Sequence, residues 1–195
     1  MTVRHSRTAG PPPTTTTTWR LFFGIPTPEY LQRCLQDLQT DFRGDWRPVN
    51  PTQFHVTLAF LGEIPEDKIP SLVEAGRAAA RDTPTFAARF CGLTAFPDLR
   101  RPRVGVALID SEPLNILADR LKAALSQHNL TGDSRPFHAH LTLVRSRGGE
   151  VETPDKKLSR SWDITAFHLY RSILRPEGPR HLILASFPLN FPPPD

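Results

Sequence analysis

The pattern His-x-Thr-Leu occurs twice in this chain, at 55–58 and at 140–143, and this repeat constrains the fold more than any other feature. Each copy lies in a short apolar segment, Phe54–Leu61 or Phe137–Val144, whose length and composition are typical of a buried β-strand. Two such segments in one chain indicate two similar structural units that bury their apolar faces against one another.

The segments around the two motifs occur in the same order. An apolar strand and an amphipathic helix precede each motif strand, and a further strand follows it. In the first half we expect strands at 20–25, 54–61 and 86–96 and helices at 28–39 and 65–81. In the second half we expect strands at 103–109, 137–144, 162–174 and 181–187 and a helix marked by Leu114, Leu117, Leu121 and Leu125. The polar segments 45–52 and 148–160 are predicted to be loops, the second with a short helix.

The strand periodicity places the polar residues of each motif together. Successive side chains of a strand point to opposite faces, so His55 and Thr57 share one face, and the aliphatic residues between and after them occupy the other. His140 and Thr142 are related in the same way. If the two units meet about a pseudo-twofold axis, both His-Thr pairs face a single cleft.

Length and composition fit one globular domain. The chain has 195 residues, of which 38% are hydrophobic, and this is enough to bury a core. Residues 1–18 are rich in proline and threonine and offer little to bury, so we expect a disordered tail followed by a single domain over 19–195. Cys34 and Cys91 have no metal-binding spacing and are too few for a disulfide framework, which favours a reducing compartment.

Charge and hydropathy narrow the class of partner. A net charge of +4 and a pI near 9.5 are compatible with an anionic partner. The N-terminal segment lacks the apolar core of a secretory signal, and no apolar run reaches membrane-spanning length. We therefore expect a cytoplasmic protein that does not bind a membrane.

The two motifs supply the groups that displacement at phosphorus requires. An imidazole has a pKa of about 6.5, so His55 and His140 can act at neutral pH as proton donor and acceptor on opposite sides of a phosphorus atom. The hydroxyls of Thr57 and Thr142 can donate to the non-bridging oxygens, which carry charge in the transition state. Because a phosphodiester has only one negative charge, the set predicts a phosphoesterase that needs no metal and no other cofactor.

Zinc binding is the main chemical alternative. His138 and His140 form a His-x-His pair, and such pairs on strands do bind zinc. A third ligand is missing, because neither motif strand has a Cys, Asp or Glu at useful spacing. Glycine-rich phosphate loops and nucleophile-elbow motifs are also absent from the sequence.

Arg145 is the basic residue that we expect to contact substrate. It follows the second motif strand directly and can reach a phosphate or a base. Strand alternation places it opposite His140, so the contact requires a β-bulge or the end of the strand.

The motifs and their surroundings resemble a known family. The two His-x-Thr-Leu segments resemble the paired motifs of the two-histidine phosphoesterase superfamily. The wider context resembles the RNA 2',3'-cyclic phosphodiesterases, also called 2'-5' RNA ligases, and this context consists of the segments 20–26, 54–62, 95–97, 101–103, 135–145 and 169–172. The resemblance extends from about Trp19 to Leu189.

This resemblance implies a fold and a mechanism. The fold would be α+β, bilobal and duplicated, with two antiparallel sheets lining a central cleft and helices outside. The reaction would be the metal-independent opening of a terminal 2',3'-cyclic phosphate to a 2'-phosphate. His55 would donate a proton to the departing 3'-oxygen, and His140 would activate water. Thr57 and Thr142 would hold the phosphate, and His181 stands where family members often carry tyrosine.

Several functions remain open at this point. RNA ends that bear a cyclic phosphate are the leading substrate, and 2'-5' ligation or hydrolysis of a small cyclic nucleotide would use the same chemistry. A non-enzymatic alternative is an RNA-binding module with an inactive site. Since one chain carries both motifs, no obligate protein partner is required, and we expect a monomer.

Overall fold

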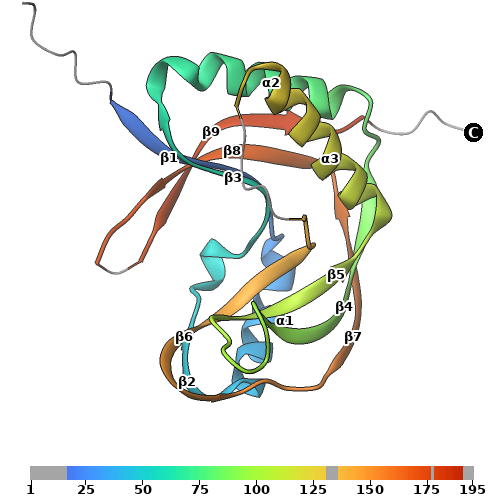
Figure 1. The fold of residues 1–195 in the computed structure, drawn as a ribbon. Helices are drawn as coiled ribbons and strands as arrows, with labels where there is room; N and C mark the ends of the chain where they lie inside the picture. The colour runs from blue at the N-terminus through green and yellow to red at the C-terminus, as the bar shows by residue number, and fades with distance from the viewer. Residues whose placement is uncertain (1–16, 131–135, 177, 191–195) are drawn as a thin grey trace, which may run out of the picture.

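Antiparallel strands make up most of the computed structural model, which describes residues 17–130, 136–176 and 178–190. The strands are β1 (Thr18–Pro26), β2 (Arg43–Pro48), β3 (His55–Pro65), β4 (Phe86–Phe96), β5 (Val104–Asp110), β6 (His140–Glu152), β7 (Lys157–Ile164), β8 (Ala166–Ile173) and β9 (Arg180–Pro188). The helices are α1 (Glu29–Leu38), α2 (Ile69–Arg81) and α3 (Glu112–Gln127), and short 3-10 turns lie at Gln39–Asp41, Pro51–Gln53 and Glu66–Lys68 (Figure 1).

The sheet is arranged symmetrically about its centre, with a motif strand and three further strands on each side. The path of hydrogen-bonded strands is β7-β4-β5-β6-β3-β1-β8-β9, so the two motif strands, β3 and β6, are central neighbours. On each side the motif strand pairs with the strand that precedes it in its own half of the chain, β1 or β5. β2 pairs with the end of β6 that extends beyond β3. The chain is therefore α+β with a mainly antiparallel sheet, as predicted.

The number of sheets differs from the prediction. We predicted two separate sheets, but hydrogen bonds connect all nine strands into one. The connection is narrow, because β3 and β6 share a single register pair, Val56 with Leu141. β3 and β6 do not pair beyond this point. β3 continues beside β1, and β6 continues beside β5 and β2.

Parts of the two segments predicted to be loops, 45–52 and 148–160, are strands. Residues 43–48 form β2, and residues 148–160 complete β6 and begin β7 with no helix. Their polar sequences gave no strand signal, because both segments are stabilised mainly by backbone pairing with distant strands. The predicted strand at 162–174 is two strands, β7 and β8, and the helix predicted from residue 65 begins at Ile69.

The predicted tail covers residues 1–18. Residues 1–16 lie outside the described residues, and Thr18 is the first residue of β1.

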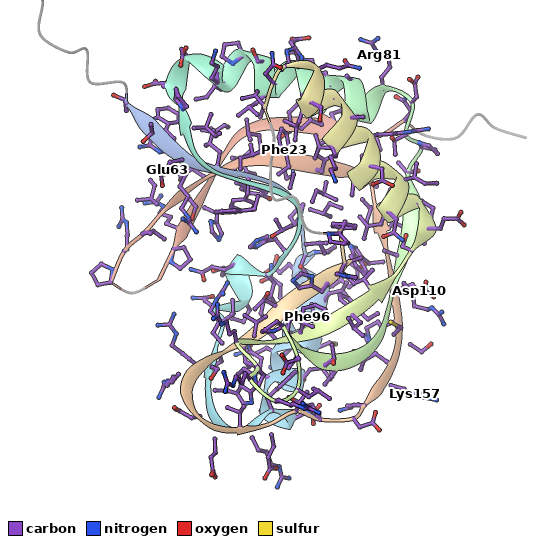
Figure 2. The ribbon with its side chains drawn as sticks, viewed as in Figure 1. Phe23, Glu63, Arg81, Phe96, Asp110 and Lys157 are labelled. Atoms are coloured by element: carbon purple, nitrogen blue, oxygen red, sulfur yellow. The ribbon has the colours of Figure 1, made fainter. Side chains whose placement is uncertain are left out.

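Helices α2 and α3 pack against each other over the half of the sheet that contains β1, β3, β8 and β9 (Figure 1). α3 begins after Ser111, whose hydroxyl accepts a hydrogen bond from the backbone N–H of Leu114 at 3.4 Å. Leu114, Leu117 and Leu121 recur at helical spacing and are fully buried, as is Phe23 of β1 on the facing side of the sheet (Figure 2). This apolar layer leaves the opposite face of β3 available for a site. None of the helices within the described ranges is both long and apolar enough to span a membrane.

Both motif strands contain a β-bulge at the leucine of the motif. In β3, Thr57 pairs with Gly24 and Ala59 pairs with Phe23, so Leu58 is an extra residue. In β6 the same break occurs one residue after Thr142, which leaves Leu143 as the extra residue. A bulge shifts the alternation of side chains, so residues beyond it change faces.

Candidate active site

The two motif histidines are held by the same contact. Nδ1 of His55 lies 2.7 Å from the carbonyl oxygen of Gln53, and Nδ1 of His140 lies 2.6 Å from the carbonyl oxygen of His138. A carbonyl oxygen only accepts hydrogen bonds, so each Nδ1 carries a hydrogen and donates it. In the neutral ring the lone pair is then on Nε2. Both imidazoles are fixed in the tautomer that can exchange a proton through Nε2.

The two His-Thr pairs line one cavity. His55 and Thr57 from β3 and His140 and Thr142 from β6 all border a space of about 210 Å³, and all four side chains are half-buried. The strand order explains this convergence, because β3 and β6 are adjacent and each presents its pair on the face opposite its buried aliphatic residues. A cavity of this size accepts a phosphate group with part of an attached nucleoside.

Burial sets the protonation of both imidazoles. Desolvation lowers the pKa of His55 below the ordinary value of 6.5, the hydrogen bond to Gln53 opposes this effect, and the charges of Arg145 and His140 lower the pKa further. Desolvation also lowers the pKa of His140, with the contact to His138 acting in the opposite direction. Each ring is therefore neutral in a larger fraction of molecules at pH 6.5 than a free imidazole, and an anion bound between the rings would favour the charged forms.

Arg145 reaches the cavity because of the bulge in β6. Without the bulge it would lie opposite His140, but the extra residue, Leu143, returns it to the face of Thr142, and it lines the cavity. The bulged backbone is well supported, since the carbonyl oxygen of Leu143 accepts hydrogen bonds from the N–H of Val49 at 2.9 Å and from Nε2 of Gln39 at 2.7 Å. The sequence-based prediction required a β-bulge or the strand end to bring Arg145 to the site, and the bulge at Leu143 meets this requirement.

Phe22 and His181 pack against the ring of His55. Phe22 lies 4.8 Å from it between ring centroids, and His181 lies 5.2 Å away in an edge-to-face arrangement. Tyr170 stacks on the other side of Phe22 at 5.0 Å. Desolvation, aided by the charges of His55 and Arg145, lowers the pKa of His181 to about 4, so this third histidine is neutral near pH 7. Its Nδ1 is buried and has no hydrogen-bond partner among the described residues.

The structure separates the two histidines of the His-x-His pair. His140 faces the cavity described above, and the exposed ring of His138 lines a neighbouring hollow with Phe96, at 6.2 Å between ring centroids. Within the ranges that the structure describes, no three His, Cys, Asp or Glu side chains lie close enough together to bind a metal ion. His138 contributes its backbone carbonyl, which orients His140, and the charge of its ring adds to the lowering of the pKa of His140.

Sequence reasoning missed several residues of the cavity wall. Arg47, Asn50 and Gln53 come from a segment predicted to be a loop, and Gly178 and Pro179 come from the turn between β8 and β9. Nothing in their local pattern distinguishes them, because only the long-range pairing of β2 with β6 and the contact of the Gln53 amide with the carbonyl of Pro179 bring them to the site. Trp46 and Phe54, which lie near the first motif in the sequence, are buried and belong to the core.

Known proteins are similar to this chain in sequence and in fold. A family model described as LigT like Phosphoesterase matches residues 25–106. An RNA 2',3'-cyclic phosphodiesterase of Thermus thermophilus is 36% identical over 180 residues, which cover 88% of this chain and 90% of that protein. A crystal structure of a protein from the same organism, 34% identical, has a TM-score of 0.82 over 88% of this chain and 98% of that one. The crystal structure of Escherichia coli LigT complexed with 3'-AMP, 28% identical, has a TM-score of 0.73 over 88% and 98% of the two chains.

Proposed function

Because this chain belongs to the RNA 2',3'-cyclic phosphodiesterase family of LigT-like phosphoesterases, we propose that it opens 2',3'-cyclic phosphates at RNA ends to 2'-phosphomonoesters. One observation carries the proposal: two imidazoles, each fixed through Nδ1 by a backbone carbonyl, border the same cavity. With their Nε2 atoms free, the rings are suited to act on opposite sides of one phosphorus atom.

The proposed reaction is an in-line displacement by water. His140 accepts a proton from the water as its oxygen bonds to phosphorus, the bond from phosphorus to the 3'-oxygen breaks, and His55 donates a proton to that oxygen. The products are a 2'-phosphate and a free 3'-hydroxyl, and the proton gained by His140 replaces the one lost by His55 after exchange with solvent. The roles of the two rings follow the family resemblance. The negative phosphate offsets the desolvation that disfavours a protonated His55 in the free protein.

Three further side chains are assigned to the phosphate. We assign the hydroxyls of Thr57 and Thr142 to the non-bridging oxygens, since they come from the same strand face as the histidines and line the same cavity. Arg145 supplies a fixed positive charge beside Thr142. Together with a protonated imidazole, these groups neutralise a singly charged diester, so the proposed mechanism uses no metal and no other cofactor.

We also propose that the site is the centre of a single duplicated, bilobal domain, which includes β1 from Thr18 onward. The mirrored strand order about β3 and β6 and the bulges at Leu58 and Leu143 support this duplication. Because one chain supplies both halves of the site, we propose that the protein acts as a monomer, without an obligate protein partner, on RNA or oligonucleotide ends. A cytoplasmic location remains a prediction from the sequence.

The test is end analysis of the reaction products. A short RNA with a 2',3'-cyclic phosphate is incubated with the protein, and chromatography then separates the 2'-phosphate from the 3'-phosphate product. We expect only the 2'-phosphate, at a rate unchanged by EDTA, and little product from His55→Gln or His140→Gln. A 3'-phosphate product, or full activity of either variant, would contradict the mechanism. Loss of activity in EDTA with recovery on adding zinc would contradict metal independence, and tight RNA binding without turnover would support a binding module.

A further inference from the structure

Two arginines lie side by side on one wall of the cavity. Arg47 of β2 and Arg145 of β6 are register partners in the antiparallel pair, so their side chains leave the sheet on the same face. Both line the cavity that His55 and His140 border, and both are exposed. β2 pairs with the same edge of β6 as β3 does, beyond the last contact with β3, so Arg47 lies on the β3 side of Arg145, farther along β6 than His140 and Thr142.

The two guanidinium groups repel each other. The charge of Arg47 contributes to lowering the pKa of Arg145, after desolvation. Among the residues that the structure describes, no Asp or Glu lines the cavity, and the ion pairs there, Arg77–Glu74, Arg89–Asp110 and Lys156–Asp41, involve neither arginine. Like charges directly opposite on neighbouring strands are unfavourable unless an anion lies between or beside them. This part of the wall is therefore suited to bind an anion beside the two arginines.

One reacting phosphate does not account for both arginines. A cyclic phosphodiester carries a single negative charge, and two hydroxyls, one protonated imidazole and Arg145 already face it. Arg47 lies on the neighbouring strand, beyond the end of the β3–β6 pairing, and is left to contact the next phosphate of an RNA strand, which follows the ribose of the terminal nucleotide. We propose that Arg47, on the strand next to Arg145, binds a second phosphate, the phosphodiester on the 5' side of the terminal nucleotide, so that the protein prefers oligonucleotide ends to mononucleotides.

This inference rests on the proposed function and is tested with substrates that differ in the second phosphate. The substrates are adenosine 2',3'-cyclic phosphate, its 5'-phosphorylated form, and the dinucleotide ApA with a terminal 2',3'-cyclic phosphate. We expect the wild type to have a higher kcat/KM for the two substrates with a second phosphate, mainly through KM. In Arg47→Gln the ratio of kcat/KM for the dinucleotide to kcat/KM for adenosine 2',3'-cyclic phosphate should fall about tenfold, as for the loss of one charge-assisted hydrogen bond.

Salt dependence and a matched control identify the cause of the change. For the dinucleotide, the slope of log kcat/KM against log salt concentration should become shallower by about 0.7 in Arg47→Gln, the value for one phosphate contact to a single strand. Arg47→Lys keeps the charge and should retain most of the slope. Arg43→Gln removes an exposed arginine of the same strand that does not line the cavity, and it should keep the wild-type ratio.

The outcomes distinguish this inference from the proposed function. If the wild type hydrolyses none of the three substrates, the proposed function fails. If it hydrolyses all three with no preference, or if the preference survives Arg47→Gln, the second phosphate site is wrong while the proposed function stands. A gain confined to the dinucleotide and insensitive to Arg47 would mean that the second nucleoside is recognised instead of its phosphate. A gain for the 5'-phosphorylated mononucleotide that is lost in Arg47→Gln would support the phosphate site directly.

Discussion

Replacing Gly105 with alanine tests how tightly the strand beside Arg145 is packed. Gly105 lies on β5 and pairs with Val144, the residue that follows the bulge in β6. A Cβ atom at position 105 would lie 2.5 Å from Cγ2 of Val144 and 2.7 Å from Cδ1 of Phe42, whereas ordinary van der Waals contacts are 3.4–4 Å. Both neighbours are buried core side chains, so both must move by about 1 Å to accept one methyl group.

The net effect is destabilising because the overlap outweighs the gain in the unfolded chain. Adding a methylene-sized group to a packed core costs about 1–3 kcal/mol. Replacing glycine with alanine lowers the entropy of the unfolded chain and returns about 0.4–1 kcal/mol. We therefore expect Gly105→Ala to lower the free energy of unfolding by about 1–2 kcal/mol. Displacement of Val144 also shifts the neighbouring Arg145, so kcat/KM should fall in the folded variant.

Urea denaturation measures the loss of stability in Gly105→Ala, and a double-mutant cycle tests whether overlap with Phe42 causes it. With an m-value of about 2 kcal/mol/M, the midpoint should fall by about 0.5–1 M. Phe42→Leu creates space beside the new methyl group, so Gly105→Ala should cost less in that background than in the wild type. A coupling of about 0.5 kcal/mol or more is expected for residues in contact. A midpoint at or above that of the wild type, or strictly additive effects, would refute the packing argument.

Two other predictions concern the cavity. Thr57→Val and Thr142→Val remove one hydroxyl each with little change in shape, and each should lower kcat about 10²–10³-fold if the hydroxyls contact the charged oxygens of the transition state; a loss below threefold in both would contradict their assignment. His181 has its pKa lowered to about 4 in the folded protein, so between pH 6.5 and 4 it is protonated mainly in the unfolded state, and stability is lost as the pH falls through this range. His181→Gln should therefore lose less stability between pH 7 and 4 than the wild type in urea titrations, and an equal loss would show that burial does not hold this ring neutral.

The elements that the sequence predicted correctly are those with strong local periodicity. The leucines of α3 define one helical face, and the apolar segments around the motifs define β3 and β6. Alternation within each strand was enough to place His55 with Thr57 and His140 with Thr142, because both pairs precede the bulge of their strand. The structure brings these four residues to one cavity.

The parts that the sequence did not predict depend on contacts between distant residues. β2 contains glycine, charged residues and a proline and is a strand because β6 offers it a free edge. Arg47 therefore entered the site without any local signal. The bulge at Leu143 is supported by Gln39, which is more than a hundred positions away in the sequence, so Arg145 could be placed in the cavity only conditionally.

The most direct test of the two-histidine mechanism is the pH dependence of kcat/KM for a cyclic-phosphate dinucleotide in three proteins. The wild type should give a bell, because one ring must be neutral and the other protonated, and its maximum should lie below pH 6.5, since burial lowers the pKa of His55 and of His140 in the free protein. His140→Gln should be slower by at least about 10²-fold and lose the acid limb, and His55→Gln should be similarly slow and lose the alkaline limb. If either variant keeps wild-type activity, or if both keep the full bell, then the two imidazoles do not act as acid and base on one phosphorus atom.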